Sequence, residues 1–199
     1  MKVIIKVIVF FCCILLLEIV QLTWGQDKEF IEIQIKRWSE EVRKNPKDFE
    51  TVAAIGSAYG KLGQHEKAIQ YFKKAVEINP SYADAYLGMA AAYGFLGQLD
   101  AKIAACEKAI ALKPDNAEAY GNLGSALGRT GRYKESVQAL NEAIRLKPDF
   151  GDAHFGLGLA YLFLGSRDLA IKQAKMLEQI NPVLAKQLRD VIDSISNRK

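Results

Sequence analysis

The sequence is poor in the residues that most often carry catalysis or hold metal ions. It contains three cysteines and two histidines in 199 residues, and His65 and His154 lie far apart in the chain. Cys12 and Cys13 belong to an apolar N-terminal run, so a chain cleaved after that run would keep only Cys106. One thiol cannot form an internal disulfide. We therefore expect neither a disulfide framework nor a metal site.

Recognisable catalytic motifs are also missing. The sequence has no G-x-x-x-x-G-K-[ST] phosphate loop, no G-x-S-x-G nucleophile turn and no H-E-x-x-H zinc motif. Its glycine-rich pieces follow no predicted strand, so they do not indicate a phosphate-binding loop. We predict that the chain is not an enzyme and binds no cofactor.

Neither sign of charge dominates the sequence. The formal net charge is +4, and no long run of like charges forms a basic tail or an acidic arm. This balance is too mild to indicate nucleic-acid binding. Half of the residues are hydrophobic and a quarter are charged, which is an ordinary composition for a folded domain.

Long hydrophobic runs are confined to the N-terminus, in residues 1–25. Two lysines precede an uninterrupted apolar run at residues 7–17, and the small residues Thr23 and Gly25 precede a candidate cleavage point. This pattern is typical of a secretory signal peptide and predicts an exported protein, whether periplasmic, secreted or lumenal. The alternative is a membrane-anchored protein that keeps this segment, with charged side chains in or beside the hydrocarbon.

The few prolines are the clearest feature of what the sequence does contain. All five are evenly spaced, at Pro46, Pro80, Pro114, Pro148 and Pro182, and every interval is the same (80 − 46 = 34, and likewise onward). Glycines keep the same interval at Gly63, Gly97, Gly131 and Gly165. A fixed period of this length predicts a repeat architecture, in which each unit buries its apolar face against the next.

Each unit contains two stretches whose apolar residues recur at helical spacing. In the third unit these stretches cover residues 117–129 and 132–146. Asp115 and Asn116 are good caps for the first stretch, and Gly131 suits the left-handed turn between the two. No stretch shows sustained two-residue alternation, so we predict an all-α fold without strands.

The units also share small and aromatic residues at fixed offsets. In the first unit they are Ile55, Gly56, Tyr59, Ala68, Phe72, Ala75 and Pro80. This pattern resembles the tetratricopeptide repeat. The resemblance implies an α-solenoid of four tandem 34-residue helix–turn–helix units, at residues 49–82, 83–116, 117–150 and 151–184.

Amphipathic helices are predicted on both sides of these units. Residues 26–48 contain a leading helix with an apolar side formed by Phe30, Ile31, Ile35, Trp38 and Val42. Residues 185–199 contain a C-terminal helix that would cap the last unit with a polar outer face. The leading helix could also pair with a second copy of itself, which would make the protein a homo-oligomer.

Several residues depart from the family pattern, among them Lys102, Cys106 and His154. Lys102 stands where a small residue normally lets two helices touch, and the neighbouring Ala101 predicts a small local adjustment. Cys106 replaces an aromatic residue and is expected to be a buried structural thiol rather than a nucleophile. His154 occupies an aromatic packing position.

In this family the first helix of each unit lines a concave groove, and the resemblance therefore implies a surface for a partner. The offsets place six candidate partner-binding residues there: Leu87, Phe95, Asn122, Phe155, Leu159 and Phe163. The first-turn carboxylates Glu50, Asp84, Glu118 and Asp152 would form an acidic edge, although such residues also simply match the helix dipole. Large apolar side chains on an exposed face often mark a partner site, and the alternative is that they pack on neighbouring units.

These observations predict an exported, non-enzymatic scaffold or adaptor that binds a peptide segment of a protein partner in the groove. The alternative is a membrane-tethered subunit of an envelope assembly or secretion complex. Repeat domains that hold the acidic C-termini of heat-shock chaperones use a clamp of basic and amide residues, of which only Asn122 is matched here. Depending on the register, Glu118 or Asp152 stands at one of the clamp positions and would repel a carboxylate. We therefore reject binding of chaperone C-termini as the function.

Overall fold

The computed structural model describes residues 27–196, and the described part of the chain is helical without strands. The leading helix occupies residues 27–44. It is followed by α2 (Phe49–Lys61), α3 (His65–Ile78), α4 (Ala83–Phe95), α5 (Leu99–Leu112), α6 (Ala117–Arg129), α7 (Tyr133–Leu146), α8 (Gly151–Phe163), α9 (Arg167–Ile180) and α10 (Pro182–Ser196). The predicted all-α solenoid is confirmed.

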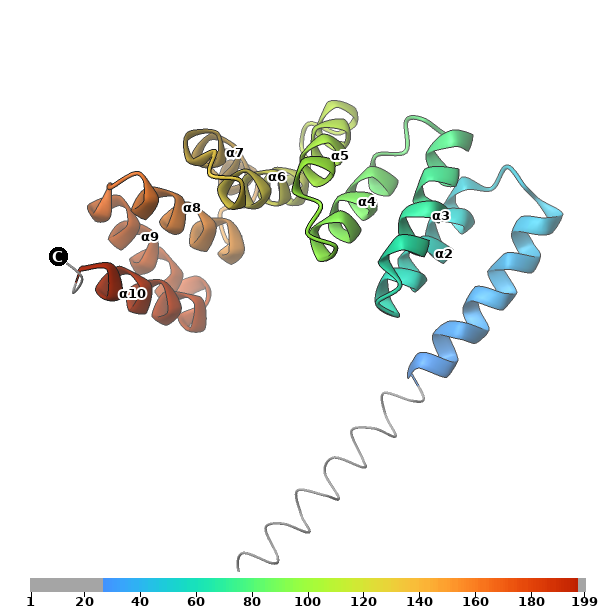
Figure 1. Cartoon of the computed structure of the whole chain (residues 1–199), viewed down its shortest axis with the longest axis horizontal. Helices are drawn as coiled ribbons and strands as arrows, with labels where there is room; N and C mark the ends of the chain where they lie inside the picture. Colours follow the sequence, from blue (N-terminus) through green and yellow to red (C-terminus); the bar gives the residue numbers. More distant parts are fainter. Residues whose placement is uncertain (1–26, 197–199) are drawn as a thin grey trace, which may run out of the picture.

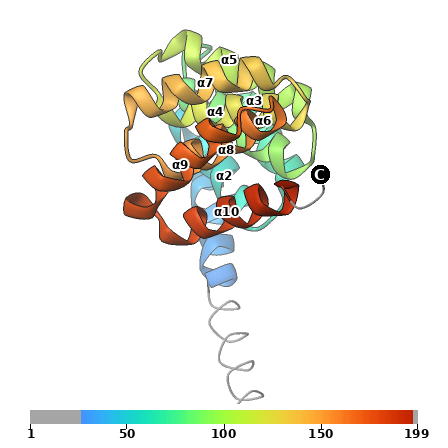
Figure 2. The same cartoon turned by 90° about the vertical axis from the view of Figure 1, so that its left-hand side faces the viewer.

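The helices stack in pairs along a curved array (Figure 1). The pairs α2/α3, α4/α5, α6/α7 and α8/α9 correspond to the four predicted units, and the second helix of each pair packs on the first helix of the next. The last helix, α10, takes the place of a further first helix and contacts both α8 and α9. Figure 2 shows α10 on the opposite side of the array from α5 and α7.

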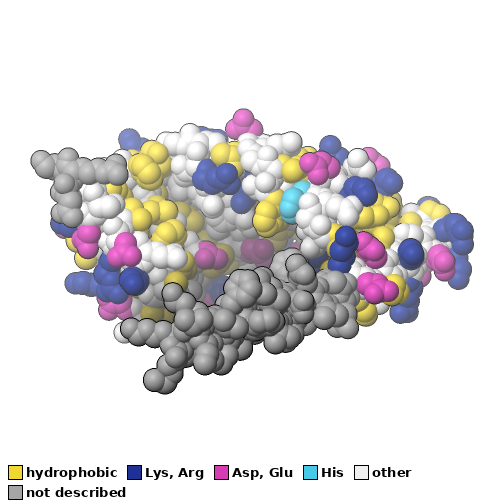
Figure 3. All heavy atoms as spheres, turned by 60° about the horizontal axis from the view of Figure 1, so that its bottom comes forward, with side chains coloured by type: hydrophobic (Ala, Val, Ile, Leu, Met, Phe, Trp, Pro, Cys, Tyr) yellow, Lys and Arg dark blue, Asp and Glu magenta, His cyan; other side chains and the backbone are white. Residues whose placement is uncertain are grey.

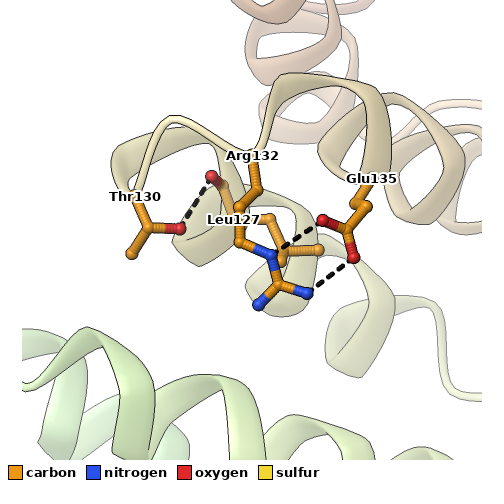
Figure 4. A network of polar contacts seen from close by, with 4 residues as sticks. All are labelled: Leu127, Thr130, Arg132 and Glu135. Atoms are coloured by element: carbon orange, nitrogen blue, oxygen red, sulfur yellow. Dashed lines mark hydrogen bonds and ion pairs between the residues drawn. The ribbon is translucent and has the colours of Figure 1, made fainter.

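The turn inside each unit is centred on the periodic glycine. Gly131, for example, has a φ of 79°, in the left-handed region that favours glycine. Beside it, the Thr130 hydroxyl donates a hydrogen bond of 3.0 Å to the Leu127 carbonyl, and the Arg132 guanidinium donates to Glu135 at 2.8 and 2.6 Å (Figure 4). The Arg132–Glu135 pair is exposed and therefore contributes little stability.

Two of the first helices, α2 and α6, are capped by short polar side chains. The Asp48 carboxylate accepts a 3.0 Å hydrogen bond from the Thr51 N–H, and Asn116 accepts one of 3.1 Å from the Ala119 N–H. These contacts satisfy amide groups at the start of α2 and α6 that have no partner within the helix. The predicted cap at Asn116 is thus confirmed.

The C-terminal helix begins three residues earlier than predicted. Pro182 is its first residue rather than part of the preceding joint. The side chain of Asn181 accepts hydrogen bonds from the N–H groups of Val183 and Leu184, at 3.1 and 3.2 Å. Proline is well tolerated at the first helical position, because the N–H that it lacks would have no partner there.

Some glycines of the first helices are small for packing reasons. A Cβ atom at Gly88 would lie 2.4 Å from the ring of Phe72, which the preceding unit inserts there. Two units later, Leu140 takes the place of Phe72 and Gly156 takes the place of Gly88. A Cβ atom built on Gly156 would lie 3.3 Å from the Leu140 side chain. Gly88 is therefore part of the contact between units.

The leading helix packs against the first unit. Its side chains Ile31, Ile35, Trp38 and Val42 join a cluster with Ile55 and Ala58 of α2. Phe30 was predicted on this apolar side but is 61% exposed, and Ile33 is 53% exposed. Pairing of this helix with a second copy stays a prediction.

The predicted signal peptide or membrane anchor, residues 1–25, lies outside the described residues. Between residues 27 and 196, none of the helices combines the length and the apolar character that a membrane crossing requires.

Candidate functional site

The concave face contains a groove over α6 and α8. It contains an open cavity of about 950 Å³ whose walls come from α6, the first half of α7, the joint before α8 and α8 itself. Its floor is made of small residues, namely Gly121, Gly124, Ser125, Gly128 and Gly156. Figure 3 looks onto this hollowed face, where hydrophobic side chains gather toward the C-terminal end of the array, on the left.

Four of the six predicted groove residues line this cavity: Asn122, Phe155, Leu159 and Phe163. The remaining two, Leu87 and Phe95, lie on α4 and do not contribute to it. Leu87 is half-buried, whereas Phe95 is 76% exposed. The six predicted residues therefore fall into two groups. Four line the cavity over α6 and α8, and two, Leu87 and Phe95, lie apart from it on α4.

Phe95 and Phe163 each stack on a ring from the preceding unit. The rings of Phe163 and Tyr133 lie 4.7 Å apart between centroids at an interplanar angle of 5°. Phe95 stacks in the same way on His65, at 4.5 Å and 3°. Stacking covers one face of each phenylalanine and fixes its orientation.

Tyr133 and His65 were not predicted as site residues. Each is the first residue of a second helix, and each precedes its phenylalanine by the same separation (163 − 133 = 30 and 95 − 65 = 30). An aromatic pair with this separation is a signal that the sequence does contain. Tyr133 also lines the cavity, which adds it to the candidate site.

Phe155 and Leu159 have a second role in packing. Both are half-buried and contact the core cluster of α9 and α10, which includes Leu177 and Leu188. Phe163 is 63% exposed and lies outside that cluster. Among the apolar residues of the groove, Phe163 is therefore the one with the most surface free for a partner.

Charged side chains occupy the rim of the cavity. Glu118 and Asp152 lie in the first turns of α6 and α8, where they match the positive ends of the helix dipoles. Arg129 lies in the last turn of α6, where its charge likewise matches the dipole. Lys147, also on the rim, places its Nζ 5.4 Å from the centre of the Phe150 ring. The groove thus carries Glu118, Asp152 and Lys147 near the starts of the first helices, and Arg129 where α6 ends.

Lys102 does not move out of the position where the family has a small residue. The second helices of the units begin at a constant interval (99 − 65 = 34 and 133 − 99 = 34), so α5 is not shifted, and Lys102 is only 8% exposed. Lys102 therefore keeps this buried position, and Ala101 does not take its place. The lysine side chain runs along Gly94, where a Cβ atom would lie 3.2 Å from Lys102 Cδ.

Cys106 and His154 are buried as predicted. Burial raises the pKa of the Cys106 thiol to about 12, so the nucleophilic thiolate is scarce at neutral pH.

His154 Nδ1 lies 2.7 Å from Gln173 Oε1, and its Nε2 lies 2.9 Å from the Pro148 carbonyl oxygen. His154 therefore ties α8 to α9 and to the preceding joint. No group of three or more His, Cys, Asp or Glu residues within the described range is arranged to hold a metal ion.

Three family models of tetratricopeptide repeats match the chain. The model described as TPR repeat matches residues 56–97 and 129–165, and two models described as tetratricopeptide repeat match residues 105–138 and 83–116. The matches together run from residue 56 to residue 165. With the helix pairs and their packing, they show that the chain belongs to the tetratricopeptide repeat family.

Solved structures share this fold. A crystal structure of MamA is 31% identical, with a TM-score of 0.70 over 76% of this chain and 89% of that chain. A second MamA crystal structure is 30% identical, with a TM-score of 0.71 over 81% and 88%. The first TPR domain of Spaghetti (RPAP3), solved with a bound HSP90 peptide, is 23% identical, with a TM-score of 0.58 over 59% and 94%. No curated protein matches the chain.

Proposed function

We propose that this protein is a non-enzymatic scaffold or adaptor that holds a peptide segment of a protein partner in its concave groove. The observation that carries the proposal is Phe163, whose 63% exposed side chain is fixed by Tyr133 at the edge of a 950 Å³ cavity. An oriented aromatic side chain loses little conformational freedom when a partner covers it. Membership of the tetratricopeptide repeat family supports an interaction scaffold in general.

The shape and lining of the groove favour an extended or helical segment with apolar side chains. Phe155 and Leu159 offer half-buried apolar surface between Asn122 and Phe163. A segment lying along α6 and α8 would bury apolar residues on these anchors, while Asn122 is available to hydrogen-bond a peptide group. Grooves of this kind usually bind through a few apolar anchors spaced along the segment.

A related fold gives independent support for peptide binding. The TPR domain of Spaghetti was solved with an HSP90 peptide bound, so a domain of this fold can hold a peptide. This chain carries Glu118 and Asp152 on the rim of its groove, which argues against the same acidic C-terminus as ligand at that rim. The proposed segment is therefore apolar where it meets Phe155, Leu159 and Phe163.

Selection of peptides from a random display library on the full-length protein tests this function. Wild type is expected to enrich peptides with apolar residues at regular spacing, and Phe163→Ala is expected to lose them. Met176→Ala is a matched control, because Met176 is 48% exposed on α9 and lies outside the cavity. Enrichment of the same peptides by Phe163→Ala and by wild type would contradict the groove assignment.

The location of the protein is a separate part of the proposal. The pattern of residues 1–25 favours an exported protein and, as an alternative, a membrane-tethered subunit of an envelope assembly or secretion complex. The intact mass of the protein isolated from its native cells distinguishes the two. A mass lacking residues 1–25 excludes the tether, and a full-length mass in the membrane fraction excludes cleavage.

A further inference from the structure

The apolar groove residues of α8 have equivalents on α4, two units earlier. Phe95 stands at the same place in its unit as Phe163, and Leu87 stands at the same place as Phe155 (163 − 95 = 68 and 155 − 87 = 68, two intervals of 34). The helix between them, α6, carries an arginine and a glycine at these two places. The array therefore presents two apolar positions of the same design, separated by a helix without apolar bulk there.

The fold does not require a phenylalanine at the position of Phe95. In the first and third units the same place holds Lys61 and Arg129, and both side chains are exposed. Phe95 is 76% exposed, which is the highest value among the large hydrophobic side chains of residues 27–196. An exposed apolar side chain that packing does not require is a candidate for contact with a partner.

A ring lies beneath each of the two phenylalanines and is absent where the charged residues stand. Phe95 stacks on His65, as Phe163 does on Tyr133, and in both pairs the lower ring comes 30 residues earlier (95 − 65 = 30). The residues that precede the two charged side chains by the same separation are aliphatic, namely Ile31 and Leu99. Within the described range, a ring at the start of a second helix thus accompanies a phenylalanine that it holds in place.

His65 is unfavourable for the stability of the fold itself. Its Nδ1 is buried without a hydrogen-bond partner, and it is the one buried side-chain nitrogen or oxygen in the described part of the chain of which this is true. A buried polar atom without a partner opposes folding. Leu99 at the equivalent position has no such atom. The flat face that the imidazole places beneath Phe95 therefore explains this residue better than the packing of α3 does.

The separation between the two apolar positions sets the length of a segment that reaches both. In the array α4 packs on α6, and α6 packs on α8. Packed helices have axes about 8–10 Å apart, so the step from α4 to α8 is about 16–20 Å. An extended chain advances about 3.3 Å per residue, so about five or six residues cover that step.

We propose that Phe95 and His65 form a second anchor site, which takes an aromatic side chain of the partner segment onto the free face of the Phe95 ring. This inference rests on the proposed peptide binding and specifies its ligand. The segment carries one apolar side chain over α8 and an aromatic one about five or six residues away, with small or polar residues between them over α6. Its two anchors bind cooperatively because one chain joins them.

A series of labelled peptides tests the second anchor site in the full-length protein. Each peptide has two phenylalanines, and the peptides differ only in the number of serine and glycine residues between them. A matched peptide has alanine in place of one phenylalanine. Fluorescence anisotropy on wild type is expected to show an optimum when the phenylalanines are about five or six positions apart, with about tenfold tighter binding than the single-phenylalanine peptide.

Three variants identify the source of that optimum. Phe95→Ala is expected to reduce the affinity at every spacing to that of the single-phenylalanine peptide. His65→Leu takes the residue of the next unit, so it is expected to melt at no lower temperature than wild type and still to weaken the optimum severalfold. Phe30→Ala is the control, because Phe30 is 61% exposed on the leading helix, away from the groove. An optimum that survives in Phe95→Ala, or that Phe30→Ala also removes, would overturn the second anchor site.

A second probe separates this inference from the proposed function. N-acetyl-phenylalanine amide is titrated into protein carrying p-fluorophenylalanine at position 95, 163 or 30, and the ¹⁹F resonance is followed by NMR. A shift at position 95 that exceeds the shift at position 30, and that His65→Leu reduces, supports the second anchor site. It does so even if no peptide binds, an outcome that would count against the peptide function alone. Equal shifts at positions 95 and 30 overturn the site, even where position 163 responds.

Discussion

The ring of Phe163 lies parallel to that of Tyr133 in the preceding unit, and the same geometry joins Phe95 to His65. Both pairs connect the start of one unit's second helix to the end of the next unit's first helix. Repetition of the same pair two units apart (163 − 95 = 68) indicates that the repeat geometry itself orients these exposed rings. The proposed function depends on that orientation, and it makes Phe163 the first residue to test.

Phe163→Ala is expected to weaken binding of a groove-selected peptide about tenfold or more, since truncating an aromatic anchor costs at least about 1–2 kcal/mol of binding free energy. The side chain is mostly exposed, so the melting temperature should change little. Isothermal titration calorimetry and thermal unfolding measure the two effects. Equal losses of stability and affinity would mean that Phe163 supports the fold rather than the partner.

Gly124→Ala is expected to destabilise the third unit by about 1–3 kcal/mol, the usual cost of overpacking. The new Cβ atom would lie 2.5 Å from Leu140 Cγ and 3.3 Å from the backbone nitrogen of Leu140, so the two helices would have to separate. Gly60→Ala is the control. Its nearest neighbour would be at 3.9 Å, and alanine in a helix should stabilise by up to about 1 kcal/mol. Urea denaturation of both variants checks this contrast, and a similar loss in both would refute the packing argument.

Because Asp48 caps α2 as a carboxylate, its contribution to the free energy of unfolding should decrease in acid. Hydrogen bonds from the Thr51 N–H and hydroxyl lower the pKa of the Asp48 carboxyl below its ordinary value of about 3.9. Because the folded-state pKa is the lower one, the stabilisation is fully present above about pH 3.9 and is lost as pH falls through the folded-state value. Asp48→Ala is expected to cost about 1 kcal/mol at neutral pH and less in acid.

Asn116→Ala is the matched control for that measurement. Asn116 caps α6 through the same type of hydrogen bond but does not titrate. Its loss should cost about 1 kcal/mol as well, with no change between pH 3 and pH 7. Urea unfolding at both pH values compares the two variants, and the account fails if their costs follow pH in parallel.

Cys106 is expected to resist thiol reagents in the native protein. Its side chain is fully buried, and its raised pKa leaves almost no thiolate at pH 8. Iodoacetamide labelling followed by peptide mass spectrometry should find Cys106 unmodified until denaturant is added. An added thiol at an exposed position of the same helix, Lys108→Cys, should react within minutes. Labelling of Cys106 at a comparable rate would show that α5 is not packed as described.

Much of the fold could be predicted because turns and helix ends require particular residue types, and these residues recur at a fixed interval in the sequence. Gly131 has the positive φ that its position demanded, and Asn116 forms the predicted cap. Pro182 was harder to interpret, since a proline that ends one helix can also begin the next. Only the hydrogen bonds of Asn181 decide between these outcomes.

The site was less predictable, because it depends on where long side chains run. The offsets placed Phe155, Leu159 and Phe163 at the groove, but they could not show that α10 partly covers the first two. From the sequence, Lys102 was too large for its position, and a small local adjustment of the helix was predicted. Burial along Gly94 depends on space between two helices that the periodicity of the sequence does not describe.

The measurement that tests the central claim most directly is site-specific photo-cross-linking in the native cell. One photoreactive residue replaces Ser125, which is exposed on the groove floor, and another replaces Lys108, which is exposed on α5 outside the cavity. We predict a discrete protein adduct from position 125 that disappears with Phe163→Ala, and no such adduct from position 108. An adduct at position 108 alone, or one at position 125 that persists with Phe163→Ala, would contradict the groove as the partner-binding surface.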